Sequence, residues 1–253
     1  MIQRATILQE LLAMSRALGR PQGDLVILAE GNTSARLPGG TFAVKSSGAS
    51  LETLTEDGLV ECRTQPLLKL LDGPLPDDEV TEKALMDARV DPRSRKPSVE
   101  AVFHAVLLEL PGVSFVGHTH PTSVNSILCS ARAGAFARQR RYPDEIVCCG
   151  PESLLVPYVD PGIALAREIH RLAGEFVQRT GAAPRAILLQ NHGLIALGGS
   201  TASVLATTTM MEKAARIFLG AEQLGGAEPL SPQDVARIAS RPDEHYRQRL
   251  LKM

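Results

Sequence analysis

Two periods of hydrophobic and polar positions alternate along this chain, and they predict strands and helices in turn. Residues 2–18 carry apolar side chains at helical spacing, whereas residues 34–37 and 41–45 flank a Pro-Gly-Gly turn that is typical of a β-hairpin. Short apolar runs predict further strands, and longer amphipathic stretches predict further helices. The further strands are expected at residues 59–61, 113–117, 145–149, 154–156 and on both sides of 191–193, and the further helices near residues 81–89, 98–110, 122–130, 161–179, 201–224 and beyond 231.

This order of elements indicates an α/β fold with a mostly antiparallel central sheet covered by helices. No shift in composition marks a boundary between domains. We therefore expect residues 1–253 to form a single domain, with a helical C-terminal extension from about residue 225.

Composition narrows the class of protein. Hydrophobic residues make up 44% of the 253 residues, which is ordinary for a globular enzyme, and the net charge of −1 argues against a general nucleic-acid binder. No apolar run is long enough to span a bilayer, and the first residues lack the pattern of a signal peptide. The four cysteines show no Cys-x-x-Cys spacing, so a reduced, cytoplasmic location without membrane partners is expected.

Two histidines follow the apolar run at residues 113–117. Side chains on a strand alternate between its faces, so His118 and His120 would point the same way and form half of a tetrahedral metal site. The alternative is a chance His-x-His sequence at the end of a strand. His192 lies at an Asn-His-Gly break between two predicted strands, and it is the natural candidate for a third ligand.

Three imidazoles with an open fourth position describe a catalytic zinc site rather than a structural one. Such an ion can polarise a carbonyl or stabilise an enediolate. Glu100 falls near the start of a predicted helix, after Ser98 as the N-cap, and it is the candidate general base and acid. These residues fit proton transfer next to a carbonyl, or reverse aldol cleavage. His104, in the same helix, is expected to be packed or hydrogen-bonded rather than a ligand.

Two loops rich in Gly, Ser and Asn follow neighbouring segments, at residues 31–34 and 46–50. Their backbone N–H groups and hydroxyls suit a phosphate or a carboxylate, and the alternative is ordinary turn chemistry. The basic run at residues 138–141 predicts a solvated face, or else an anion contact at the rim of the site or across a subunit boundary.

Five short motifs, in their order and approximate spacing, give the chain a family resemblance. It resembles the class II aldolase/adducin family, which includes fuculose-phosphate and rhamnulose-phosphate aldolases, over roughly residues 5–220. The motifs are Gly31-Asn32-Thr33-Ser34, Ser46-Ser47-Gly48, Pro97-Ser98-Val99-Glu100, His118-Thr119-His120 and Asn191-His192-Gly193-Leu194-Ile195.

The resemblance implies a zinc-bearing α/β/α sandwich, usually assembled as a cyclic homotetramer, that acts on a small sugar phosphate or hydroxy-ketone. Carried over by position, the zinc ligands are His118, His120 and His192, and Glu100 is the catalytic acid and base. The positions that match the phosphate-binding residues are Asn32, Ser47, Gly48 and Ser98.

The chain departs from the family pattern in three places. Val99 stands where the sugar-phosphate aldolases often carry a second serine, which removes one hydroxyl from the expected phosphate site. The segment at residues 60–97 is longer than in the compact fuculose-type enzymes. A tyrosine that some members lend to a neighbouring site has no clear match here; the candidates are Gln139, Tyr142 and Tyr246.

Three functions are consistent with these residues. The first is a zinc-dependent aldolase that cleaves a ketose phosphate or a related hydroxy-ketone, and another divalent metal could replace zinc. The second is a sugar-phosphate epimerase, a dehydratase such as methylthioribulose-phosphate dehydratase, or a decarboxylase on the same metal site. The third is a non-catalytic adducin-like scaffold, although a scaffold has no need of the three histidines and Glu100.

Overall fold

The predicted hairpin forms part of a seven-stranded sheet in the computed structural model, which describes residues 2–250. The strand order is β3-β2-β1-β4-β7-β6-β5. Neighbouring strands are antiparallel except β5 and β6, which are parallel, so the sheet is mixed but mostly antiparallel, as the sequence predicts. The strands are β1 (Asn32–Leu37), β2 (Thr41–Lys45), β3 (Leu59–Arg63), β4 (Phe115–Thr119), β5 (Leu154–Val156), β6 (Ala186–Leu189) and β7 (Gly193–Gly198).

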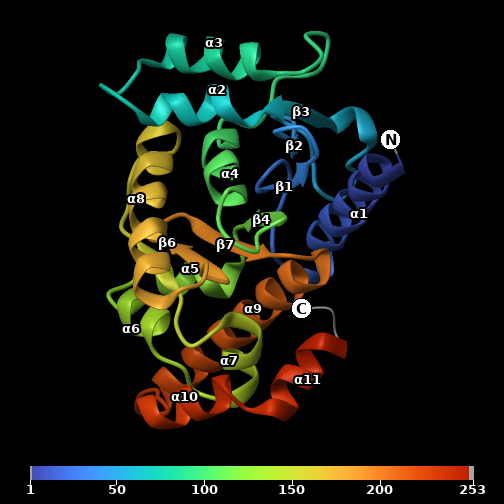
Figure 1. Cartoon of the computed structure of the whole chain (residues 1–253). Helices are drawn as coiled ribbons and strands as arrows, with labels where there is room; N and C mark the ends of the chain where they lie inside the picture. The colour runs from blue at the N-terminus through green and yellow to red at the C-terminus, as the bar shows by residue number, and fades with distance from the viewer. Residues whose placement is uncertain (1, 251–253) are drawn as a thin grey trace.

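Helices cover both faces of this sheet (Figure 1). One face packs against α2 (Thr64–Leu68), α3 (Asp78–Ala88), α4 (Ala101–Leu108) and α8 (Ile163–Thr180). The other face packs against α1 (Ile2–Leu18), α5 (Thr122–Leu128), α6 (Ala133–Arg138), α7 (Pro143–Cys149) and α9 (Thr201–Gln223). Beyond α9, the helices α10 (Pro232–Ala239) and α11 (Pro242–Leu250) contact α7, and short 3-10 turns lie at Pro21–Gly23, Glu56–Gly58 and Lys69–Leu71.

Alternation along the central strands assigns each side chain to one of the two layers. In β4, Val116 belongs to the core under α4 and α8, while Phe115 belongs to the core under α1. Gly117 faces α1 and α9 so closely that a Cβ there would lie 2.8 Å from Val204 Cγ1. His118 has the parity of Val116 and therefore faces the α4 layer.

Most predicted elements are present, with end positions shifted by a few residues. The helix at residues 2–18 and the strand at residues 41–45 are confirmed, and the first hairpin strand begins two residues earlier than predicted. The helix expected from Ser98 begins at Ala101, so Glu100 occupies the N-cap position; its backbone N–H donates to Ser98 Oγ over 3.3 Å. The helix expected from residue 161 begins at Ile163.

The prediction of a strand at residues 145–149 is wrong, because these residues belong to α7. Pro143 occupies the first turn, where its missing N–H costs nothing, and Asp144 and Glu145 follow where carboxylates favour a helix N-terminus. The helix places Cys149 and its neighbours against α9. Leu67 and Leu68 end α2, and Lys69–Leu71 is a 3-10 turn.

The basic run at residues 138–141 is a solvated face only in part, because Arg138 and Gln139 are exposed whereas Arg140 is buried. Arg140 is 1% exposed, and its guanidinium donates to the carbonyl of Gly150 over 2.7 Å and to Ser153 Oγ over 2.9 Å. Arg141 pairs with the buried Glu145. These contacts tie α6, α7 and the start of β5 together, so the two arginines serve the fold. Among the described residues, no helix has the length and apolar character needed to cross a membrane.

Candidate metal centre and active site

The three candidate histidines converge at one end of β4 and β7. His118 is the fourth residue of β4 and pairs with Asn32 on one side and Ile195 on the other. His120 follows the end of β4, and its backbone N–H donates to the carbonyl of Leu25 over 2.8 Å. His192 lies in the turn between β6 and β7, after Asn191, whose φ of +55° lies in the left-handed region that asparagine tolerates.

Their ring nitrogens are close enough to share one ion. Each histidine offers a nitrogen, and the three lie within 4.8 Å of one another. His118 Nε2 and His120 Nε2 are 3.0 Å apart. Ligand nitrogens around a tetrahedral zinc ion, at about 2.0–2.1 Å from the metal, lie about 3.3 Å from one another. The arrangement therefore fits a divalent metal site with an open coordination position.

The protonation of the rings suits metal binding as well. His118 Nδ1 donates to the carbonyl of Leu194 over 3.0 Å, which leaves the Nε2 lone pair facing the other two rings. Burial, followed by the neighbouring His120 and His192, holds the pKa of His118 well below its ordinary value. Burial also lowers the pKa of His192, although Glu100 opposes it. Neutral imidazoles are the form that binds a metal.

Glu100 lies directly beside the three histidines. Its Oε1 is 3.4 Å from His192 Nε2, and its Oε2 is 3.6 Å from His118 Nε2. Oε2 also accepts a hydrogen bond of 2.6 Å from Asn32 Nδ2, and the same amide nitrogen donates to Ser98 Oγ over 3.2 Å. The buried carboxylate of Glu100 thus contacts His118, His192 and Asn32, and the Asn32 amide links it to Ser98.

Ser47 and Gly48 are brought next to Ser98 by backbone pairing. Ser47 N donates to the carbonyl of Lys96 over 2.9 Å, and Ser98 N donates to the carbonyl of Lys45 over 3.1 Å. Ser47 and Gly48 are exposed, so the loop presents its hydroxyl and backbone to solvent at the edge of the site. Asn32, Ser98, Ser47 and Gly48 therefore form a neighbouring group, which we call the anion cradle because the family resemblance predicts an anion there. Val99, without a hydroxyl, is 46% exposed beside it.

Lys45 is a charged residue of this site that the sequence reading missed. It ends β2 with 2% exposure, and its Nζ donates to the carbonyls of Ala49 over 2.6 Å and Ala29 over 3.0 Å. Burial lowers the pKa of Lys45 to about 8, although the nearby Glu100 opposes the shift. A lysine directly after an apolar strand and before a Ser-Ser-Gly loop was the available signal.

Two glycines allow the strands to approach the histidines. A Cβ on Gly193 would lie 2.7 Å from His120 Cδ2 and 2.7 Å from the carbonyl oxygen of Thr119. Gly31 has a φ of +64°, and a Cβ there would lie 2.5 Å from the carbonyl oxygen of His118. The Gly residues of the Gly-Asn and His-Gly motifs are therefore required by close packing around the site.

The other candidate residues divide as follows. His104 is fully buried in α4 and bonded to Ser34 and Asn32, which confirms a packed, hydrogen-bonded residue. Tyr142 is half-buried and its hydroxyl donates to Met210 Sδ over 3.3 Å. Gln139 and Tyr246 are exposed.

A cavity of about 390 Å³ opens next to the histidines. Its lining includes His120, Glu30, Ile27, Asn125 and Thr122. Glu30 Oε1 lies 3.7 Å from His120 Nδ1, so this carboxylate faces the outer side of that ring. The volume suits a small-molecule substrate.

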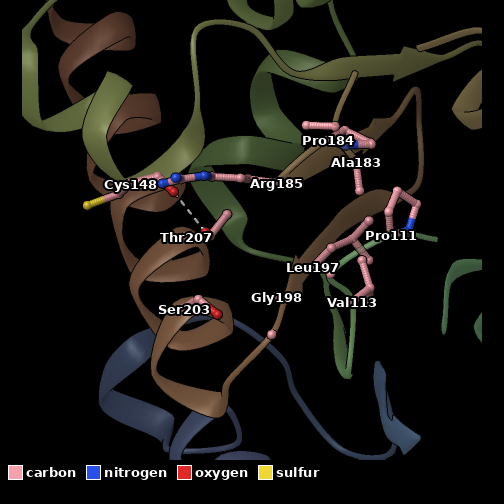
Figure 2. Close-up of a pocket in the computed structure, with 13 residues that line it drawn as sticks. Pro111, Val113, Cys148, Ala183, Pro184, Arg185, Leu197, Gly198, Ser203 and Thr207 are labelled. Atoms are coloured by element: carbon pink, nitrogen blue, oxygen red, sulfur yellow. Dashed lines mark hydrogen bonds between the residues drawn. The ribbon is translucent and has the colours of Figure 1, made fainter. Parts of the chain in front are cut away.

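A second cavity, of about 180 Å³, lies at the opposite end of β4 and β7, lined by Val113, Leu197 and Gly198. Figure 2 shows Arg185 reaching from the start of β6 toward Cys148 at the end of α7. Its guanidinium donates to the carbonyl of Val147, so it caps that helix. This cavity is separate from the histidines.

The fold and this constellation agree with what the chain matches among known proteins. Residues 9–219 match the family model described as the class II aldolase and adducin N-terminal domain. This chain belongs to the class II aldolase/adducin family.

Proteins similar to this chain are described as different kinds of enzyme. A Bacillus subtilis protein described as the uncharacterized oxidoreductase YuxG is 30% identical over 71% of this chain, and the chain spans only 23% of that protein's length. A methylthioribulose-1-phosphate dehydratase from Gluconacetobacter diazotrophicus is 25% identical, over 82% of this chain and 90% of that protein. A solved L-fuculose 1-phosphate aldolase has a TM-score of 0.70 at 19% identity, covering 92% of this chain and 94% of that one. The likeness to the solved aldolase shows the fold, and the match over residues 9–219 shows the superfamily, in which most members are metal-dependent lyases.

Proposed function

We propose that this chain is a zinc-dependent aldolase that cleaves a ketose phosphate, or a related hydroxy-ketone, by a retro-aldol reaction. One observation carries the proposal: the carboxylate of Glu100 lies within 3.6 Å of ring nitrogens of both His118 and His192 while it accepts a hydrogen bond from Asn32. A carboxylate positioned beside a metal site can transfer a proton next to a carbonyl.

In this proposal some residues act at the reacting centre of the substrate, and others bind its anionic end. A divalent ion held by His118, His120 and His192 would act as a Lewis acid on the substrate carbonyl. In the cleavage, the hydroxyl that becomes the aldehyde loses its proton, the carbon–carbon bond breaks, and the released carbon takes up a proton. In this proposal Glu100 carries that proton, and the anion cradle holds the phosphate with the help of the positive charge of Lys45.

A dehydratase on the same site is the second candidate. It is favoured by the likeness to the methylthioribulose-1-phosphate dehydratase, which extends over 90% of that protein. Dehydration begins instead with removal of a proton from the carbon next to the carbonyl, and the hydroxyl group on the following carbon then leaves as water. Either function would use the three histidines and Glu100.

The experiment is substrate profiling of the zinc-loaded protein. Ketose 1-phosphates, including L-fuculose 1-phosphate, and methylthioribulose 1-phosphate would be supplied separately. Release of dihydroxyacetone phosphate from a ketose 1-phosphate is the expected result. Loss of water without carbon–carbon cleavage would reject the aldolase and support the dehydratase.

Glu100→Gln tests the proposed acid and base. The variant should keep its zinc, because the three imidazoles remain, but its turnover should fall by about 10²–10⁴-fold, the usual contribution of a positioned proton-transfer group. Zinc content and turnover would be measured on the same preparation. Full turnover in the variant would remove Glu100 from the reaction.

We also propose that residues 1–253 act as one catalytic domain with a C-terminal helical extension, and that the chain assembles as a homotetramer. The match over residues 9–219 supports one domain, and the tetramer is the assembly that the family resemblance implies. Light scattering on the purified protein would measure the assembly, and a monomer would contradict it.

A further inference from the structure

His104 is a fully buried polar side chain that the proposed reaction does not use. Its ring stacks on Phe103, with ring centroids 4.7 Å apart. Both ring nitrogens are engaged: Nδ1 lies 2.7 Å from Ser34 Oγ, and Nε2 is hydrogen-bonded to Asn32 Oδ1. A ring fixed on three sides in this way has one orientation.

The periodicity of strand β1 and helix α4 explains why four residues meet: Asn32, Ser34, Glu100 and His104. Asn32 and Ser34 are two residues apart on β1, so they face the same side of the sheet. Glu100 and His104 are four residues apart at the start of α4, so they share one face of that helix. The helix face lies on the strand face, and Asn32 is held between Glu100 and His104.

The chemistry of the partners fixes the direction of each hydrogen bond. A carboxylate accepts and does not donate, so the amide nitrogen of Asn32 must face Glu100, and Oδ1 must face His104. His104 Nε2 must then carry the proton that it donates to Oδ1. Nδ1 in turn accepts from the hydroxyl of Ser34, because burial keeps the pKa of His104 well below its ordinary value and the ring carries one proton.

We propose that His104 is a positioning residue, and that the hydrogen-bonded relay Ser34–His104–Asn32 holds the Asn32 amide with its nitrogen directed at Glu100 and Ser98. Without the donor on Nε2, the amide could rotate and turn its oxygen toward the carboxylate, where two acceptors would face each other. The relay thereby fixes the carboxylate of Glu100 and one side of the anion cradle. What those groups do in turnover rests on the proposed function, whereas their orientation does not.

The first test reads the tautomer directly. In ¹⁵N NMR spectra of the full-length protein at neutral pH, the two ring nitrogens of His104 have distinct shifts according to which one carries the proton. We expect the tautomer protonated at Nε2, in the zinc-free and in the zinc-loaded protein. The tautomer protonated at Nδ1 would overturn the proposal.

The second test compares two variants for binding of inorganic phosphate to the zinc-loaded protein. His104→Leu fills similar space but has no donor, whereas His104→Gln has an amide that can donate from about the position of Nε2. In His104→Leu the Asn32 amide can turn away, and its hydrogen bond to a charged group is then lost. A bond of that kind is worth enough to predict a loss of about tenfold or more in phosphate affinity. His104→Gln should recover most of that affinity.

Zinc content is the control for both variants, and it should stay unchanged because His104 is not among the three ligand residues. Equal losses of phosphate affinity in the two variants, or none in His104→Leu, would contradict the relay. A purely packing role would be met as well by Leu as by Gln. Neither test needs turnover, so a wild-type protein without lyase activity but with the Nε2 tautomer would reject the proposed function and leave the positioning role intact.

Discussion

At the scale of single residues, the least expected feature is a lysine buried under the anion cradle. Lys45 keeps two hydrogen bonds to backbone carbonyls, yet burial lowers its pKa to about 8. A lysine is charged below its pKa and neutral above it. The positive charge beside the cradle is therefore present at neutral pH and is lost as the pH rises through about 8.

This shift predicts that anion binding weakens in mildly alkaline solution. Sulfate is a suitable probe because it remains a dianion, and its affinity for the wild-type protein should fall between pH 7 and pH 9. Lys45→Met should bind sulfate about tenfold less tightly at pH 7, since a charge interaction of about 1.4 kcal/mol is a factor of ten. Its affinity should then be flat across that range. Titration calorimetry at several pH values measures both, and an unchanged slope in Lys45→Met would contradict the role of this lysine.

At the scale of elements, local sequence signals predicted most of the helices and strands. The hairpin and the long helices were predictable because turn residues and apolar periods lie within one segment, as at Thr41–Lys45 and Thr201–Gln223. The helix α7 was not, because the four apolar residues at 146–149 fit a strand as well as a buried helix, and the helix-start signals at Pro143 and Asp144, together with packing on α9, decide between them.

The same distinction applies to the site. The shared face of His118 and His120 followed from strand parity alone. The approach of His192 depends on the pairing of β4 with β7, which is a contact between distant segments, and it was predicted from the place of His192 at a break between two strands and from the family resemblance. The burial of Lys45 and Arg140 was not predictable, because a single sequence does not show which neighbours cover a charged residue.

Gly193→Ala tests how closely β7 must approach the histidines. The added methyl would overlap His120 Cδ2 and the carbonyl oxygen of Thr119, so β4 and β7 must separate where the ligands meet. We expect zinc affinity to fall by about 10–100-fold, the range seen when the supports of metal ligands are changed. Competition with a chromophoric chelator measures this affinity.

The matched control is Gly174→Ala in the middle of α8. A Cβ at Gly174 meets nothing within 4 Å, and alanine favours a helix by about 1 kcal/mol over glycine. This variant should bind zinc as the wild-type protein does and should be slightly more stable. Equal zinc affinity in both variants would show that the strand spacing at Gly193 does not shape the metal site.

At the scale of the whole molecule, the candidate metal site joins the two halves of the sheet. Asn32 comes from β1, Glu100 from the start of α4, His118 from β4 and His192 from the turn before β7. These segments meet only when the central pairs β1–β4 and β4–β7 have formed. The unfolded chain cannot offer the three imidazoles together, so a metal that binds them stabilises the folded state as a unit.

This coupling predicts a metal-dependent melting temperature. A ligand present at a thousand times its dissociation constant stabilises a protein that binds it only when folded by about 4 kcal/mol. For a chain of this size each kcal/mol raises the melting temperature by about 2–4 °C, so zinc should raise it by roughly 10 °C. His192→Ala removes one ligand and should lose most of the zinc and most of the rise. Scanning calorimetry of both proteins with zinc and with a chelator measures the effect. A non-catalytic scaffold has no reason to retain such a site. A wild-type melting temperature that does not change with zinc, or a rise of equal size in His192→Ala, would reject the metal centre and the aldolase proposal with it.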